Sequence, residues 1–406
     1  MKQRSRAKGA SSPASPQAWL ALRSTLMLAK ETVRAIVYCL YWVAPKQDTA
    51  IVYGWPDFED SALALQEALA KTRLSKIVFF VTGDRGEPPE LLGPKTLVVE
   101  KNSVRGLFHF LTARYVFFTH RCFMRRFPPN VTSVNVWHGM PMKRTAYMLE
   151  GDQGGITSKY VLATSRLWAQ VMEATMRPLA GVLVTGLPRN DRMFPTPNLT
   201  RARLGMEATP LTRLVLWLPT HRQRYSTVGG RTSDGGKTTS PLGVDGMSAE
   251  ELNATLREHD ALALVKPHPL TQVDDVLELS NLLIVNDGWL RSRRISLYEL
   301  LGEADVLVTD VSSILVDYLI LDRPVIHLFP DLEEYASSRG FSLNPIEDYF
   351  VGPVARTPDE VLEFLSQLLL GIDAYADKRR YVRDLFHEHA DGNSTSRLLR
   401  ELRLTR

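Results

Sequence analysis

With 406 residues and a mass of 45.7 kDa, the chain exceeds what one hydrophobic core usually supports, so we expect two domains. Its 44% hydrophobic and 23% charged residues are typical of a globular protein and exclude a disordered or fibrous one. The net charge of +4 is modest, and the two cysteines, Cys39 and Cys122, form no disulfide framework or zinc-ligand pattern, which favours a reducing compartment.

Residues 1–45 are predicted to form a basic arm followed by an amphipathic helix. Between residues 18 and 44, apolar side chains recur at helical spacing while Arg23, Lys30 and Arg34 share another face. This pattern favours a helix that lies on a membrane surface. A helix packed on the first domain or on a dimer partner is the alternative.

Two other interpretations of this arm are weaker. Its longest uncharged run, from Ala35 to Pro45, is shorter than the roughly 18 residues of a membrane span, and no cleavage site follows it. A nucleic-acid partner would be accompanied by stacking aromatic residues or a recognition helix, and the sequence shows neither pattern. We therefore expect neither a signal peptide nor a nucleic-acid-binding arm.

From residue 46 to residue 198, short β-branched runs alternate with helical patterns, which predicts a parallel sheet with crossover helices. The predicted strands are 51–53, 77–81, 96–99, 115–119, 134–136, 161–164 and 182–185. Pro195, Pro197 and Asn198 then interrupt the alternation and indicate a domain boundary.

A second series of the same kind occupies residues 199–406. Its predicted strands are 214–218, 263–266, 282–285, 306–309 and 324–329, and terminal helices follow from residue 357. Residues 226–246 are rich in Gly, Ser and Thr and are predicted to form a mobile loop, either an inert insertion or a substrate lid. In open α/β sheets ligands bind beyond the carboxyl ends of the strands, so the motifs there are the candidate sites.

The first motif is Trp137-His138-Gly139-Met140-Pro141-Met142-Lys143, directly after strand 134–136. An imidazole can abstract a proton near neutral pH. Gly139 and Pro141 indicate a defined backbone beside a cleft, although a structural histidine on a turn is the alternative. His138 is therefore our candidate general base.

The second motif, Gly186-Leu187-Pro188-Arg189-Asn190-Asp191, follows strand 182–185. Arg189 is suited to binding phosphate, while Asn190 and Asp191 are suited to capping the next helix. Capping alone accounts for Asp191.

Two further motifs follow strands of the second half and bring cationic or hydrogen-bonding groups to one edge of the sheet. They read Leu218-Pro219-Thr220-His221-Arg222 and Lys266-Pro267-His268-Pro269. Thr220, Arg222, Lys266 and His268 are the candidate contacts for a polyanionic ligand. The alternative is that the prolines only end the strands.

Strand 306–309 is followed by Asp310, Ser312 and Ser313, and then by a helix that runs through Asp317. Hydroxyl and backbone N–H donors at a helix N-terminus can hold a diphosphate, and an ordinary helix cap is the alternative. The sequence contains no glycine-rich dinucleotide or P-loop motif and no carboxylates at metal-ligand spacing. We therefore expect basic side chains, without a metal ion or cofactor, to neutralise the ligand.

Five motifs, in the order W-H-G-M-P-M-K, G-L-P-R-N-D, L-P-T-H-R, K-P-H-P and T-D-V-S-S-I-L-V-D-Y followed by R-P-V-I, resemble the CDP-glycerol glycerophosphotransferase family of teichoic acid synthesis. The resemblance spans roughly Ile51 to Gly340. It departs from the family at Met140, where members often have threonine. The length resembles that of the short, primase-type members.

The resemblance implies a GT-B-like pair of Rossmann domains with the active site in the cleft, and a peripheral enzyme on the cytoplasmic face of the membrane that holds its lipid-linked acceptor. CDP-glycerol is the expected donor and needs no cofactor. His138 would deprotonate the acceptor hydroxyl, while His268 and Arg222 stabilise the departing phosphates. Ser312 and Ser313 would hold the diphosphate.

Three alternatives remain open at this point. Another polyol-phosphate transferase that uses CDP-ribitol, or a GT-B glycosyltransferase, fits the same architecture, because a fold does not fix the donor. A non-catalytic, membrane-bound protein that binds a surface polymer is a different class. With CDP-glycerol as the donor, Asp310 would orient neighbouring donors or the ribose. The oligomeric state does not follow from the sequence.

Overall fold

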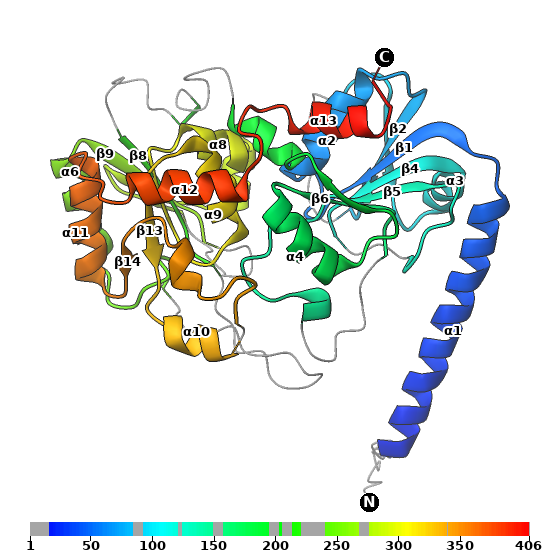
Figure 1. Cartoon of the computed structure of the whole chain (residues 1–406), viewed down its shortest axis with the longest axis horizontal. Helices are drawn as coiled ribbons and strands as arrows, with labels where there is room; N and C mark the ends of the chain where they lie inside the picture. Colours follow the sequence, from blue (N-terminus) through cyan, green and yellow to red (C-terminus); the bar gives the residue numbers. More distant parts are fainter. Residues whose placement is uncertain are drawn as a thin grey trace, which may run out of the picture.

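The computed structural model contains two parallel sheets that lie side by side, each flanked by helices (Figure 1). The residues that the structure describes are 16–83, 92–120, 124–148, 157–194, 203–204, 213–220, 240–267, 276–338 and 340–405.

The first sheet has the strand order β3-β2-β1-β4-β5-β6-β7, and every pair of neighbours is parallel. Its strands are β1 (Gln47–Tyr53), β2 (Lys76–Val81), β3 (Thr96–Glu100), β4 (Ala113–Phe118), β5 (Thr132–Asn135), β6 (Tyr160–Ala163) and β7 (Gly181–Val184). Its helices are α2 (Asp60–Ala70), α3 (Val104–Thr112), η1 (Ala146–Met148), α4 (Arg166–Met176) and η2 (Pro188–Met193). Helices cover both faces, which explains why the central strands read as continuous apolar runs.

The second sheet has the order β10-β11-β9-β8-β12-β13-β14, and only the edge strand β10 is antiparallel to its neighbour. Its strands are β8 (Arg213–Leu218), β9 (Ala261–Val265), β10 (Leu277–Glu278), β11 (Leu282–Ile284), β12 (Val306–Thr309), β13 (Val325–Leu328) and β14 (Val354–Ala355). Its helices are α6 (Ala249–Glu258), α7 (Asp287–Ser292), α8 (Leu297–Glu303), α9 (Ser313–Tyr318), η3 (Leu319–Leu321), α10 (Leu332–Ser338), η4 (Ile346–Tyr349) and α11 (Pro358–Leu369).

Both sheets have the doubly wound order in which the first strand lies in the middle, so the predicted pair of Rossmann-type domains is confirmed. The direction of winding reverses between β1 and β4 in the first sheet, and between β8 and β12 in the second. Ligands of such sheets bind outside the carboxyl ends of the strands at these switch points. The predicted strands are all present, whereas the two-residue strands β10 and β14 were not predicted.

The chain ends in two helices that join the domains. Helix α12 (Ala376–Phe386) contacts η3 of the second domain and α4 of the first, and α13 (Ser394–Glu401) packs against α2 and η2. The sequence places both helices with the second domain, whereas in the structure α13 packs on the first (Figure 1). The expected boundary near residue 198 falls outside the described residues.

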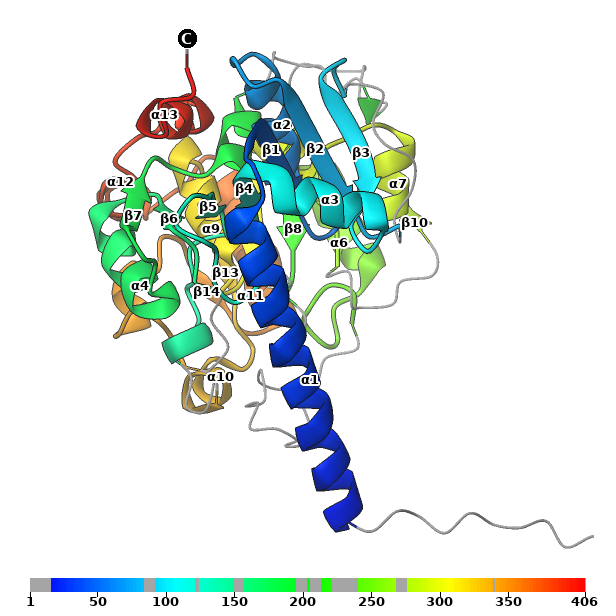
Figure 2. The same cartoon turned by 90° about the vertical axis from the view of Figure 1, so that its right-hand side faces the viewer.

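The helix expected within residues 1–45 is present as α1 (Pro16–Val43), which projects away from both sheets (Figures 1 and 2). Its C-terminal end is anchored by the fully buried Tyr41, whose ring lies 4.8 Å from that of Phe110 in α3. Large apolar side chains are exposed along it: Met27, Leu28, Val33, Ile36, Leu40, Trp42 and Val43. Within the described part of the chain, no helix is both long and apolar enough to cross a bilayer.

Candidate functional site

His138 lies on a tight turn after β5. Trp137 and Gly139 on either side of it both have positive φ, at 58° and 119°, and the Trp137 backbone N–H donates to Asn135 Oδ1 at 3.0 Å. His138 Nδ1 lies 3.4 Å from the Thr119 carbonyl oxygen at the end of β4. This contact is a hydrogen bond only when Nδ1 carries the proton, and Nε2 is then left as the acceptor.

The surroundings of His138 favour its neutral form. His138 is exposed as a residue, but burial of its ring among protein atoms is the largest cause that lowers its pKa from the ordinary value, and the positive charges of Arg189 and Lys143 lower it further. The same two causes, burial and the charge of Arg189, lower the pKa of His120 to about 4. A neutral imidazole with a free Nε2 can accept a proton, as a general base must, but the lowered pKa also makes it a weaker base than an ordinary histidine.

The turn of His138 packs directly against the second domain. Ser313 Oγ, at the start of α9, donates to the His138 carbonyl oxygen at 3.2 Å. A Cβ atom on Gly139 would lie 2.4 Å from Arg189 Nη2 and 2.4 Å from Ser313 Cβ. The structure thus brings His138, Gly139, Arg189 and Ser313, which come from both halves of the sequence, into one place.

Arg189 is held in a buried ion pair. Its Nη2 lies 2.5 Å from Asp317 Oδ2 in α9, and Asp317 is completely buried. Tyr298 donates from its hydroxyl to the same carboxylate oxygen at 2.6 Å, and the guanidinium lies 4.9 Å from the centre of the Tyr298 ring. The Asp317 carboxylate therefore already neutralises part of the positive charge of Arg189, which the sequence predicts to bind phosphate.

Asp310 and Thr220 meet at the switch point of the second sheet. Thr220 follows β8 and donates to Asp310 Oδ2 from its hydroxyl and, at 3.4 Å, from its backbone N–H. Asp310 follows β12 and is 3% exposed. Ser312 caps α9, because its Oγ accepts from the Ile314 N–H at 3.4 Å. Its hydroxyl oxygen thus already accepts a hydrogen bond from the first turn of α9.

Lys266 directly follows β9, is buried and pairs with Asp287 Oδ1 at 2.9 Å. His268 and Arg222, the other predicted cationic contacts, lie outside the described residues. Pro141 and Asn190 are buried.

The expectation that Asp191 caps the next helix was wrong. Asp191 accepts from the backbone N–H groups of Ser394 at 2.7 Å and Thr395 at 2.8 Å, so it caps α13 at the far end of the chain. No hydrogen-bond partner within the described residues reaches the side chain of Asn190. The tertiary approach of α13 to η2 puts a different helix end in front of Asp191.

Residues that the sequence analysis missed complete the site. The His120 ring is stacked on that of His138 with 4.6 Å between centroids, and Trp55 lies edge-on to His120 at 5.3 Å. Glu59 caps α2, and burial raises its pKa to about 7. His120 follows a predicted strand, so the same rule that singled out His138 could have found it.

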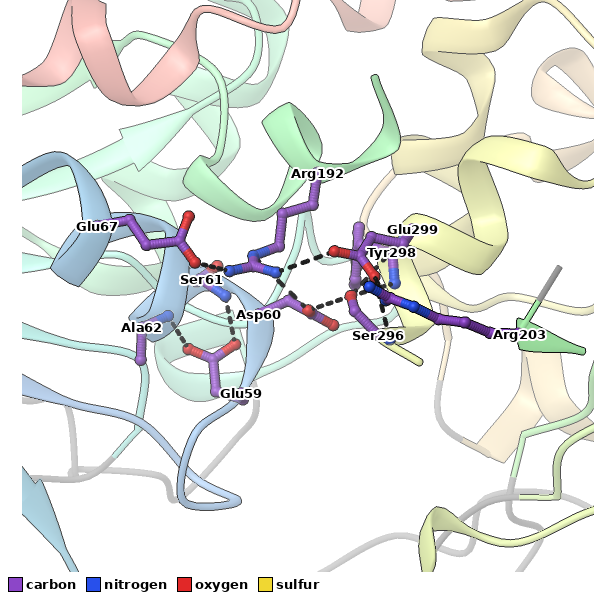
Figure 3. Close-up of polar contacts among 10 residues, drawn as sticks. All are labelled: Glu59, Asp60, Ser61, Ala62, Glu67, Arg192, Arg203, Ser296, Tyr298 and Glu299. Carbon is purple, nitrogen blue, oxygen red and sulfur yellow. Dashed lines mark hydrogen bonds and ion pairs between the residues drawn. The ribbon is translucent and has the colours of Figure 1, made fainter. Parts of the chain in front are cut away.

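A polar clasp fixes the two domains relative to each other beside this site (Figure 3). Arg192 of η2 pairs with Glu67 of α2 and, at 3.5 Å, with Glu299 of α8. Ser296, at the start of α8, donates to Asp60 of α2. We define these five residues as the clasp.

Comparisons with known proteins agree with this architecture. A family model described as CDP-Glycerol:Poly(glycerophosphate) glycerophosphotransferase matches residues 36–404. The teichoic acid ribitol-phosphate polymerase TarK of Staphylococcus aureus is 25% identical over 68% of this chain and 53% of its own, and the teichoic acid ribitol-phosphate primase of Bacillus spizizenii is 24% identical over 72% and 75%. The chain spans about half the length of the first curated relatives that it matches.

Solved structures give the same fold. The wall teichoic acid polymerase TagF superimposes with a TM-score of 0.70 at 20% identity, covering 94% of this chain and 97% of that one. At this identity the likeness establishes the GT-B-like arrangement of two Rossmann domains and leaves the chemistry to be argued from the site.

Proposed function

This chain belongs to the CDP-glycerol:poly(glycerophosphate) glycerophosphotransferase family, and we propose that it transfers glycerol phosphate from CDP-glycerol to a hydroxyl of a lipid-linked acceptor, releasing CMP. The product would extend or prime a teichoic acid or a related surface polymer. The observation that carries this proposal is His138, a neutral imidazole held through Nδ1 on a turn that faces the second domain.

In the proposed reaction the acceptor oxygen attacks the phosphorus that bears the glycerol. The bond between that phosphorus and the oxygen of CMP breaks, and the acceptor proton goes to Nε2 of His138. The Thr119 carbonyl would then stabilise the resulting imidazolium through Nδ1–H. Because phosphoryl transfer needs little covalent help from the protein, positioning and charge neutralisation supply most of the acceleration.

The donor would lie against the second domain. Lys266, Arg222 and His268 follow its strands and supply positive charge or hydrogen bonds to the diphosphate, and Ser313 adds a hydroxyl beside His138. Asp310, which accepts from Thr220 at the switch point, is placed where it can orient the ribose or neighbouring donors. No metal ion or cofactor is part of this proposal.

His138→Ala tests the assignment of the base. We expect CMP release to fall by at least about a hundredfold, because general-base catalysis by a positioned side chain contributes about that much or more. His259→Ala, which removes a histidine at the end of α6, is the matched control and should leave the rate unchanged. A folded His138→Ala protein with the wild-type rate would refute the assignment.

CDP-ribitol is the second candidate donor, because several of the matching relatives are named ribitol-phosphate polymerases or primases. Isothermal calorimetry with CDP-glycerol, CDP-ribitol and a UDP-sugar distinguishes these donors. Tighter binding of CDP-ribitol would replace glycerol phosphate by ribitol phosphate in the proposal, and tighter binding of the UDP-sugar would indicate a glycosyltransferase.

We also propose that α1 attaches the protein to the cytoplasmic face of the membrane that carries the acceptor. Its exposed apolar side chains, such as Ile36 and Trp42, support this placement. Deletion of residues 1–36, which keeps the buried Tyr41 in place, should strongly reduce sedimentation with anionic liposomes, while the rest of the chain keeps its fold by circular dichroism. Unchanged sedimentation of the truncated protein would count against membrane attachment through α1.

A further inference from the structure

His120 is a second histidine at the centre of the site, and the proposed reaction does not use it. It follows β4, next to the point where the winding of the first sheet reverses. Its ring is nearly parallel to that of His138, with an interplanar angle of 17° and 4.6 Å between centroids. Trp55, after β1, meets the His120 ring edge-on at an angle of 63°.

Thr119 connects the two imidazoles. Its Oγ1 lies 3.1 Å from His120 Nδ1, and its carbonyl oxygen lies 3.4 Å from His138 Nδ1. The backbone N–H of Thr119 donates to the Tyr53 carbonyl at 3.1 Å, which ties this residue to the end of β1. Thr119, which is fixed to the sheet, therefore contacts both rings.

The hydrogen bond to Thr119 is long for an N–H···O contact and cannot by itself fix the orientation of the His138 ring. The torsion about the bond that joins the imidazole to its Cβ is broad, so the ring plane can turn away from the Thr119 carbonyl unless a neighbour restricts it. Within the correct plane, the Thr119 contact itself selects the form that has Nδ1 at the carbonyl. Trp137 contacts one part of the ring at 3.9 Å between centroids, in a tilted arrangement. A flat partner is what restricts this rotation further, and His120 is that partner.

We propose that His120 is a positioning residue for His138: its stacked ring holds the His138 imidazole in the orientation that keeps Nδ1 on the Thr119 carbonyl and leaves Nε2 free to accept the proton. This inference rests on the proposed function of His138 as a base. His120 itself exchanges no proton with the substrate. Its contribution comes from the aromatic plane and not from its nitrogen atoms.

Three substitutions separate these contributions. His120→Ala removes the ring, His120→Phe keeps the plane without the nitrogens, and His120→Asn keeps polarity without the plane. We expect His120→Ala and His120→Asn to lower kcat for CMP release about tenfold, the size that one aromatic pair supports, with the KM for CDP-glycerol little changed. His120→Phe should restore most of kcat. His259→Ala is again the control.

A second measurement does not need activity. In ¹⁵N-histidine NMR spectra of the wild-type chain and of His120→Phe, His138 should be the Nδ1–H tautomer, whereas His120→Ala should show a mixture of the two tautomers. A wild-type tautomer in His120→Ala, a wild-type kcat in that variant, or rescue by Asn and not by Phe would each overturn the proposal.

The two hypotheses fail in different ways. Absence of CMP release by the wild-type protein with every CDP-polyol would refute the proposed function, while the tautomer of His138 would still decide whether His120 positions it. If His120→Ala does not fold, the comparison between His120→Phe and His120→Asn decides the question alone.

Discussion

Gly139, next to His138, lies against Arg189 of the first domain and Ser313 of the second. It has φ of 119°, and a Cβ atom there would lie 2.4 Å from both Arg189 Nη2 and Ser313 Cβ. Gly181, at the start of β7, has nearly the same φ of 121° but nothing within 4 Å of the corresponding position. A side chain at either glycine would strain the backbone, but only at Gly139 would it also clash with Arg189 and Ser313. Comparing the two positions therefore separates the effect of strain from the effect of the clash.

We expect Gly139→Ala and Gly181→Ala to lose similar free energy of unfolding through strain, about 1–3 kcal/mol, and Gly139→Ala to lose more because Arg189 and Ser313 must move. CMP release should fall about tenfold or more in Gly139→Ala, since small displacements of catalytic groups carry large rate penalties. It should stay near wild type in Gly181→Ala. Urea denaturation and steady-state kinetics provide both numbers, and equal rates in the two variants would contradict the expected role of the contact.

At the residue scale, the sequence could place His138, Arg189 and Ser313 at the carboxyl ends of strands, because strand ends can be read from the apolar pattern. It could not show that Arg189 would be paired with Asp317, since that contact depends on how the two sheets are docked. The stack of His120 on His138 depends on the conformation of two turns, one of which has Trp137 at positive φ, which is uncommon outside glycine.

At the scale of elements, hydrophobic periodicity was sufficient for every strand except β10 and β14. Both have only two residues, too few for a periodic pattern. The helix predicted from Thr357 illustrates the opposite case: α11 begins at Pro358, and Thr357 and Glu360 form a capping box that can be read from the sequence.

Helix α13 is capped by Asp191, a residue that lies far from it in the sequence. Asp191 accepts from the Ser394 and Thr395 N–H groups, and it provides the cap of α13 because the residue before that helix makes no side-chain cap. Asp191→Ala should cost about 1–2 kcal/mol of unfolding free energy, since two backbone donors lose their acceptor. Hydrogen exchange should rise in residues 394–401 before it rises elsewhere.

Asp191→Asn is the matched variant, because an amide oxygen can still accept one of the two bonds and should preserve part of the protection of α13. Ser103→Ala, which removes the cap of α3, serves as a control for loss of a local cap, since the bond from Gly106 N–H spans only one turn. Protection of α13 that is unchanged in Asp191→Ala would show that packing on α2 alone holds this helix.

At the scale of the whole molecule, the site exists only because the two sheets are docked against each other. The contact of Arg192 with Glu299 in the clasp and the buried pair of Arg189 with Asp317 both connect the two domains, across 107 and 128 residues of the sequence. Local sequence patterns do not reveal such distant partners. The resemblance to a family could supply the docking in outline, but not these contacts.

Acid should weaken the whole molecule through two buried histidines. His327 in β13 is completely buried and accepts from the Val351 N–H through Nε2 at 3.0 Å, and burial lowers its pKa to about 3. His387, after α12, donates from Nε2 to the Val316 carbonyl at 2.6 Å, and burial lowers its pKa to about 4. Both are neutral in the folded chain at neutral pH.

In the unfolded chain both histidines have the ordinary pKa of 6.5. Below that pH they bind protons in the unfolded chain while they are still neutral in the folded chain. The free energy of unfolding should therefore be unaffected by them above that value and fall by about 2–3 kcal/mol for each histidine as the pH drops to about 4. His327→Gln, which keeps an acceptor for Val351, should reduce the slope of this loss by about 1.4 kcal/mol per pH unit. Urea denaturation across this range measures the slopes, and an equal acid sensitivity of wild type and His327→Gln would exclude His327 as a source of the loss.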